Sequence, residues 1–92
     1  MATYVMLGKY SADAVKGIAA SRTKKVTDII EKSGGSVKTM YALLGGYDLV
    51  FIVDFPGTEA AMQASIAVTK LTGVGFSTHP AVRVEEFDRI TG

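Results

Sequence analysis

The sequence predicts an α+β domain in which two β-α-β units share one four-stranded antiparallel sheet, the ferredoxin-like βαββαβ arrangement. Residues 49–55 form a short apolar run rich in β-branched and aromatic side chains, as in a buried strand. Residues 12–32 repeat apolar side chains at helical spacing, and Gly45-Gly46 between two strand-like segments predicts a hairpin turn. Two right-handed crossovers joined by that hairpin would place both helices on one face of the sheet.

The first half of the chain predicts a strand, a long helix and a second strand. Thr3–Tyr10 is the first strand, and Ser11 is expected to cap a helix that runs from Ala12 to Lys32. Ser33-Gly34-Gly35 should end this helix, and Ser36–Leu44 should form the second strand. The apolar stripe of the helix comprises Val15, Ile18, Ala19, Val26, Ile29 and Ile30.

The second half begins with the Gly45-Gly46 turn, where both glycines tolerate the positive φ that short hairpin turns demand, and where Gly46→Val would be strained if Gly46 uses it. Leu49–Phe55 is apolar on both alternating faces, which predicts a strand buried on both sides. Thr58 is expected to cap a second helix that ends at Gly73. The apolar stripe of this helix comprises Ala60, Ala64, Ala67, Val68 and Leu71.

The C-terminal segment predicts a fourth strand with a break in it. Val74–Thr78 forms that strand, and His79-Pro80 should interrupt it because proline donates no hydrogen bond to a central ladder. Ala81–Phe87 is then expected to continue the strand or to extend it at the edge of the sheet.

Length, composition and charge limit the class of protein. Residues 1–92 make one domain, and 48% hydrophobic residues is high for so short a chain. A net charge of +1 with interspersed signs gives no field that would attract nucleic acid or a membrane surface. The absence of cysteine excludes disulfides and thiolate metal sites and fits a cytoplasmic protein. No signal-peptide or membrane-spanning pattern is present.

The predicted sheet needs a partner on one side. Four strands about 4.8 Å apart and about 20 Å long present a face of about 400 Å². Leaving a mostly apolar face of that size in water forgoes roughly 10 kcal/mol, comparable to the whole stability of a small domain. We therefore expect a homodimer, or a higher homo-oligomer, through the sheet face opposite the helices. Phe51 and Val53 lie on one face and Val50 and Ile52 on the other, so which face meets the partner stays open.

The turn Gly45-Gly46-Tyr47-Asp48, the apolar strand after it and the βαββαβ order resemble the GYD domain family, named for the motif that stands here as Gly46-Tyr47-Asp48. The resemblance extends over nearly the whole chain, including the opening Tyr-Val-Met-Leu-Gly-Lys-Tyr strand, the arginine-bearing first helix and the Gly-Gly-Ser-Val-Lys segment. It implies a dimeric α+β barrel of uncharacterised function. The larger structural class includes cofactor-independent monooxygenases, isomerases, haem proteins and amino-acid-sensing domains, so the fold does not select the chemistry.

Arg22 is the first candidate for a functional side chain, because it lies seven residues after Val15 on the apolar stripe. A guanidinium there must reach solvent, pair with a carboxylate or bind an anion, since burying it unpaired is costly. Asp48, Asp54 and Glu85 are available as partners, and a structural ion pair is the role that we expect.

Other polar side chains could line a ligand site. Asp48 is expected to accept backbone hydrogen bonds in its turn first, and to be a pocket carboxylate second. His79 is the single histidine, so one chain cannot build a multi-histidine metal site, and a strand bend is favoured over a general base. Tyr4, Tyr10 and Tyr41 would line the core or a pocket. The sequence thus predicts no catalytic set, metal site or cofactor, and a ligand-binding set consisting of Arg22, Tyr4, Tyr41, His79 and Asp48.

Two functions remain open at this point, and the sequence does not decide whether the protein is an enzyme. The first is a non-catalytic dimeric module that binds a small ligand or builds a homo-oligomeric assembly. The second is a small cofactor-independent enzyme, monooxygenase- or isomerase-like, with a pocket between sheet and helices that uses Arg22, His79 or a tyrosine. The shortage of convergent ionisable residues favours the first.

Overall fold

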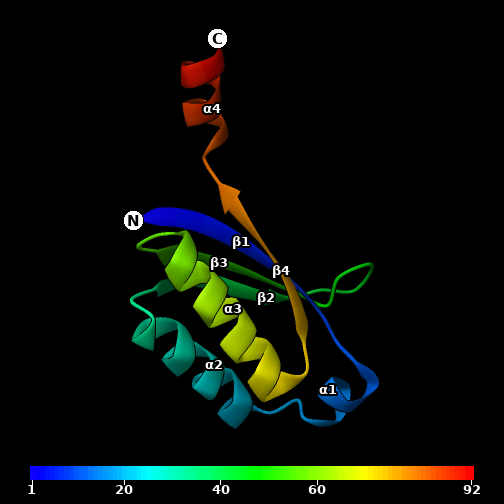
Figure 1. Cartoon of the computed structure of the whole chain (residues 1–92). Helices are drawn as coiled ribbons and strands as arrows, with labels where there is room; N and C mark the ends of the chain where they lie inside the picture. Colours follow the sequence, from blue (N-terminus) through cyan, green and yellow to red (C-terminus); the bar gives the residue numbers. More distant parts are fainter.

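The computed structural model describes all 92 residues and contains one sheet with helices on one of its faces (Figure 1). The strands lie in the order β2-β3-β1-β4, and every neighbouring pair is antiparallel. This arrangement confirms the predicted ferredoxin-like α+β fold. The strand bounds are β1 Ala2–Lys9, β2 Ser36–Ala42, β3 Leu49–Phe55 and β4 Gly75–Ala81.

The first helix is divided in two. α1 spans Ala12–Lys16 and α2 spans Ala20–Lys32, so the prediction of one continuous helix from Ala12 to Lys32 is wrong. Gly17 is the C-cap of α1, and its N–H donates to the carbonyl of Ala14 at 3.2 Å. Ala19 then adopts an extended backbone before α2 begins. Glycine is a poor helix former, which is why the chain can break here at little cost.

The core lies between the sheet and the helices α2 and α3, where α3 spans Thr58–Thr72. The rings of Tyr4 and Phe55 meet edge to face with centroids 5.6 Å apart, a favourable geometry for aromatic pairs. Val15 and Ile18 were expected in the core, but both are exposed, Val15 in α1 and Ile18 in the segment between α1 and α2. The buried cluster comprises Tyr4, Met6, Val26, Ile30, Phe51, Val53, Phe55, Ala61, Ala64 and Val68.

The start of α3 differs from the prediction. Gly57 occupies the N-cap and Thr58 begins the helix, so Thr58 is not the cap; its hydroxyl lies 3.4 Å from the phenol oxygen of Tyr4 instead. The predicted stripe of α3 is correct for Ala64 and Val68, which are buried, but Leu71 is exposed and the buried side is completed by Ala61 and Thr72. The end of the helix at Gly73 is confirmed, with φ at 74°.

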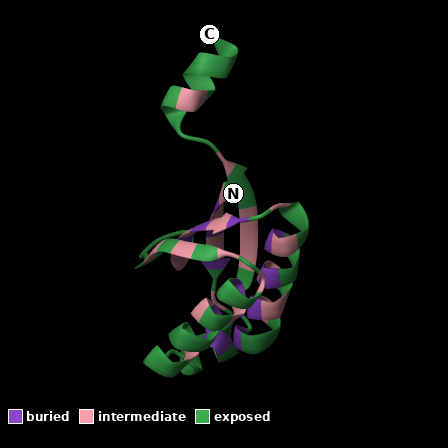
Figure 2. Cartoon of the chain, turned by 90° about the vertical axis from the view of Figure 1, so that its left-hand side faces the viewer, coloured by how far each residue is buried: buried purple, intermediate pink, exposed green.

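The C-terminal segment corrects two expectations. β4 runs through His79 and Pro80 without interruption and pairs with β1 along its length. An edge strand tolerates proline where the ring nitrogen points away from the neighbouring strand, so the expected break is wrong. The segment Ala81–Phe87 does not extend the sheet either, because α4 spans Val84–Thr91. Figures 1 and 2 show α4 standing clear of the rest of the molecule. None of the helices is long and apolar enough to cross a membrane.

The loop between β2 and β3 forms the predicted hairpin connection, although β2 ends at Ala42 and not at Leu44. Gly45 has a φ of 144°, whereas Gly46 is not among the residues with positive φ. The expected positive φ of the turn is therefore found at Gly45 and not at Gly46.

The sheet is covered on one face only. Phe51 and Val53 are buried beneath the helices, while Val50 and Ile52 on the other face are only partly buried. The register pairs Val50 with Leu7 and Ile52 with Val5, which places these four apolar side chains together on the open face. The expectation that β3 is buried on both sides does not hold within a single chain, because the face that carries Val50 and Ile52 is not covered by a helix.

Candidate functional site

A cavity of about 270 Å³ lies between the sheet and the helices, at the end where α2 begins and α3 finishes. Twelve of its fifteen lining residues are hydrophobic, and the others are Arg22, Thr23 and Thr72. An engineered apolar cavity of about 150 Å³ is enough to bind benzene. The space is therefore large enough for a small organic molecule with an apolar body.

Arg22 stands at this cavity without a carboxylate partner. Its Nη1 donates to the carbonyl oxygen of Ala14 at 2.6 Å, and its Cζ lies 5.9 Å from the centre of the Tyr10 ring. The helix break makes this contact possible, because the Ala14 carbonyl at the end of α1 accepts only from the N–H of Gly17 and has a second lone pair for Arg22. A side chain on Gly17 would put its Cβ only 2.8 Å from Nη1, so glycine leaves room for the guanidinium.

The predicted ion pair of Arg22 with Asp48, Asp54 or Glu85 is thus wrong, because each carboxylate has another partner. Asp48 accepts from a backbone N–H, and Glu85 pairs with Arg83. Asp54 accepts from the hydroxyl of Thr3 at 2.7 Å and lies 3.2 Å from the ammonium of Lys38.

Asp48 joins the hairpin loop to the end of β1. Its Oδ2 accepts from the backbone N–H of Tyr10 at 2.8 Å, and its own N–H donates to the carbonyl of Gly8 at 2.8 Å. Its carbonyl accepts from Leu43, also at 2.8 Å. This is the structural role predicted for a turn aspartate, and Asp48 does not line the cavity. It does, however, hold the backbone of Tyr10, the residue whose ring lies beside Arg22.

The other predicted ligand-binding residues are dispersed. Tyr41 lines the cavity with Arg22. Tyr4 is buried under α3 and contributes to a separate groove between α3 and β4. His79 is exposed on β4, where its Nε2 lies 2.5 Å from the hydroxyl of Ser77. The structure therefore brings Arg22 and Tyr41 together and leaves Tyr4 and His79 elsewhere.

Some cavity residues were not among the predicted ligand-binding residues, although Ile18 was placed on the apolar stripe. Ile18 reaches the cavity from the segment between α1 and α2, which was expected to be helical. Thr72 lies at the end of α3, where its hydroxyl donates to the carbonyl of Val68 at 2.8 Å and accepts from the N–H of Val74 at 3.0 Å. A threonine at such a position looks like a solvated helix residue until the packing is known.

The one carboxylate with a shifted titration lies outside the cavity. The hydrogen bond from Thr3, followed by the ammonium of Lys38, lowers the pKa of Asp54 from its ordinary value, against the opposing effect of desolvation. No three His, Cys, Asp or Glu side chains gather in a way that could hold a metal ion.

Known proteins show similarity to this chain at the levels of family and fold. Residues 4–91 match the GYD domain model. The crystal structure of the Mycobacterium tuberculosis Leucine response regulatory protein (LrpA) is similar with a TM-score of 0.59 and 11% identity, over 89% of this chain and 51% of that one. A homoserine dehydrogenase from Thiobacillus denitrificans has a TM-score of 0.57 and 14% identity, over 86% of this chain and 17% of that one.

The chain thus spans about half the length of the first neighbour and a small part of the second, and at these identities the likeness shows the fold alone. No curated protein matches the sequence. The matched range contains the Gly46-Tyr47-Asp48 turn and covers nearly the whole chain. The chain belongs to the GYD domain family.

Proposed function

We propose that this GYD domain is a homo-oligomeric module that binds a small organic anion with an apolar body in the cavity beneath α2. The observation that carries the proposal is the guanidinium of Arg22 at an apolar cavity, held by a backbone carbonyl and an aromatic ring. Neither contact neutralises its charge. A ligand carboxylate would neutralise the guanidinium through strong, charge-assisted hydrogen bonds, while the hydrophobic lining contacts the rest of the ligand.

The second candidate function is a small cofactor-independent enzyme that uses the same cavity. Arg22 would hold the acid group of the substrate, and the phenol of Tyr10, whose ring lies beside Arg22, would be a candidate proton donor. Binding of an anion is common to both functions, so it is the property to test first.

Thermal melting with a panel of small acids tests the binding. Benzoate, phenylacetate and 4-methylpentanoate are compared with their neutral amides, each added to wild-type protein and to two variants. A ligand at 100 times its dissociation constant stabilises by about 2.7 kcal/mol, which corresponds to at least about 10 °C in a domain of this size. We expect one or more acids, but not the amides, to raise the melting temperature of the wild type.

The variants separate the site from general charge effects. Arg22→Met keeps most of the side-chain stem and should lose the acid-dependent shift. Lys25→Met removes an exposed positive charge from the same helix, and this variant should retain the acid-dependent shift. Equal shifts in Arg22→Met and wild type, or equal shifts with acids and amides, would contradict the proposal. Native mass spectrometry of protein purified from its own host would identify a retained ligand directly.

The oligomeric part of the proposal is supported by the open face of the sheet. Val5, Leu7, Val50 and Ile52 form an apolar patch there that no part of the same chain covers. We expect the wild type to self-associate in light scattering, and Ile52→Glu to run at a lower mass because a charge cannot be buried unpaired between two sheets. Lys25→Glu on the outer side of α2 is the control. A folded wild-type monomer at micromolar concentration would contradict the dimer.

The module is proposed to act in the cytoplasm, on the ground that the chain uses no cysteine. Fractionation of the tagged protein in its host tests that location.

A further inference from the structure

α4 is an amphipathic helix whose apolar side has no partner in the chain. Val84, Phe87 and Ile90 recur every third residue and are 69%, 53% and 61% exposed. Figures 1 and 2 show the helix projecting from the end of β4, away from the sheet and from the other helices. An isolated helix shorter than about 12–15 residues is marginal in water, and α4 has 8. Packing of its apolar stripe against another surface must therefore supply most of its stability.

The chain also exposes more surface than its size predicts. Its accessible surface is 5964 Å², whereas a compact monomer of 9.7 kDa exposes about 5,100 Å². The excess of about 800 Å² is what one partner contributes to a protein interface of standard size. The projecting helix belongs to the matched family domain, because the GYD model extends through residue 91. The excess surface and the unpartnered stripe of α4 are what we expect when the surface that covers them belongs to another molecule.

A groove of about 200 Å³ between α3 and β4 offers a surface of the right kind. Phe76 and Ala61 contribute apolar lining, and Met62 and Ile66 are large apolar side chains exposed on α3. The space exceeds what one benzene ring needs, so it can accept a phenylalanine side chain. Pro80 lies at the groove, next to the residue where β4 ends and the chain leaves towards α4.

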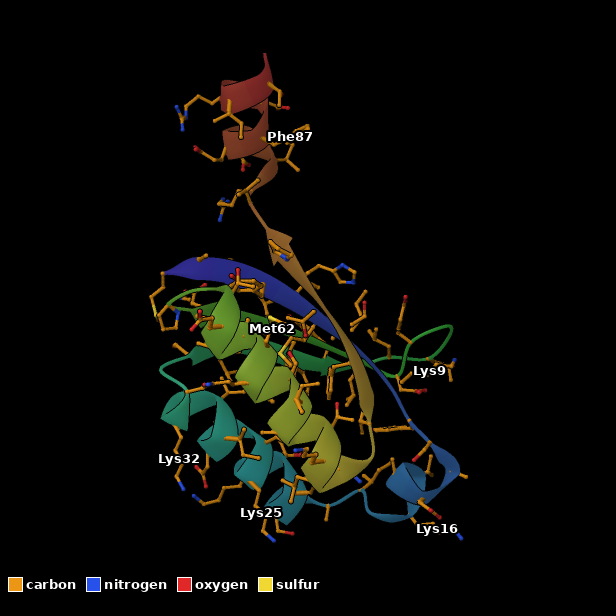
Figure 3. All side chains as sticks on the ribbon, in the orientation of Figure 1. Lys9, Lys16, Lys25, Lys32, Met62 and Phe87 are labelled. Carbon is orange, nitrogen blue, oxygen red and sulfur yellow. The ribbon has the colours of Figure 1, made fainter.

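We propose that α4 of one copy docks into the α3–β4 groove of a second copy, with Phe87 seated beside Met62 and Ile66. The groove and the base of α4 adjoin in each copy, and Figure 3 shows Met62 in the part of α3 nearer to α4. A two-fold axis beside Ala81 therefore brings each α4 to the groove of the other copy, and the exchange is reciprocal.

The backbone favours exchange over docking within one chain. Residues 82–83 alone separate β4 from α4, and Arg83 is extended, with φ at −64° and ψ at 148°. The chain thus continues outward along the direction of β4, whereas docking on its own groove would require it to reverse within two residues. The second copy reaches the same contact without that reversal.

Cross-linking tests the exchange directly, because the chain has no native cysteine. A tagged Phe87→Cys chain is mixed with an untagged Ile66→Cys chain under mild oxidation, and we expect a disulfide-linked heterodimer of intermediate mass as the main product. Leu44→Cys on the exposed hairpin replaces Ile66→Cys as the matched control and should give background yield. One chain carrying both Phe87→Cys and Ile66→Cys should link to a second chain. If it closes an internal disulfide instead, α4 rests on its own copy and the exchange is wrong.

Sedimentation gives a second, non-covalent measurement. Phe87→Ser should raise the dissociation constant of self-association by at least about 10-fold, the effect of truncating a central aromatic anchor. Asp88→Ser, on the charged side of α4, should leave it unchanged. The exchange would be overturned if Phe87→Ser associates as tightly as wild type and the Phe87→Cys and Ile66→Cys pair cross-links no more than the Leu44→Cys control. It would leave the sheet-face dimer standing, because Ile52→Glu tests that interface separately.

Discussion

Replacing Asp48 tests whether the Gly-Tyr-Asp turn holds the rim of the cavity in place. The carboxylate accepts the backbone N–H of Tyr10 at 2.8 Å, and the ring of Tyr10 carries the guanidinium of Arg22. Asp48→Ala removes the acceptor and leaves that N–H without a protein partner. Asp48→Asn keeps an acceptor of the same shape and removes only the charge.

The structure sets the expected size of each effect. A hydrogen bond to a charged group contributes about 1.5–3 kcal/mol, and this one is partly exposed, so water can replace the lost acceptor and the lower end applies. We expect Asp48→Ala to lose about 1.5 kcal/mol and Asp48→Asn about half of that, since charge assistance roughly doubles the strength of the bond. In a domain of this size these losses lower the melting temperature by about 6–12 °C and about 3–6 °C. Asp28→Ala, at an exposed position of α2, should stay within about 0.5 kcal/mol of wild type.

Urea unfolding followed by circular dichroism measures the free energies, with all variants at one protein concentration because self-association shifts apparent stability. Amide hydrogen exchange at Tyr10 reports on the contact itself and should lose protection in Asp48→Ala. An Asp48→Ala protein as stable as the Asp28→Ala control, with Tyr10 still protected, would refute the assigned role. Equal losses in Asp48→Asn and Asp48→Ala would show that the charge does not matter.

Three further predictions concern the turn, one titrating group and the core. Gly45→Val should lose about 1–3 kcal/mol because φ is 144° there, while Gly46→Val should be nearly neutral, and equal losses in chemical denaturation would contradict this. The pKa of Asp54 is lowered on folding, so its stabilisation is complete above the unfolded pKa of about 3.9 and disappears as pH falls through the folded value. Asp54→Asn should therefore flatten the stability curve below about pH 4, and a curve parallel to that of wild type would exclude the linkage. Phe55→Ala should lose about 3–5 kcal/mol, because the ring is fully buried, and a loss under 1 kcal/mol would show that the core collapses around the gap.

The sequence by itself determined the features that depend on neighbours along the chain. The apolar run Leu49–Phe55, the caps at Ser11 and Gly73 and the hairpin between β2 and β3 follow from local backbone preferences and from the period of the side chains. These signals were enough to predict the order of the helices and strands. That order, together with the rule that crossovers are right-handed, was enough to predict the sheet topology. The turn role of Asp48 was predicted on the same basis.

The tertiary structure alone decided the features that depend on contacts between elements. Arg22 could be placed on an apolar stripe, but its partners Ala14 and Tyr10 come within reach only after the chain breaks at Gly17. Pro80 reads as a strand breaker until β4 is known to be an edge strand. The segment that forms α4 has alternating residues that suit a strand equally well, and it becomes a helix because β4 ends at Ala81 and leaves it no ladder to join. A period in the sequence limits which side chains share a face, whereas only packing decides what that face meets.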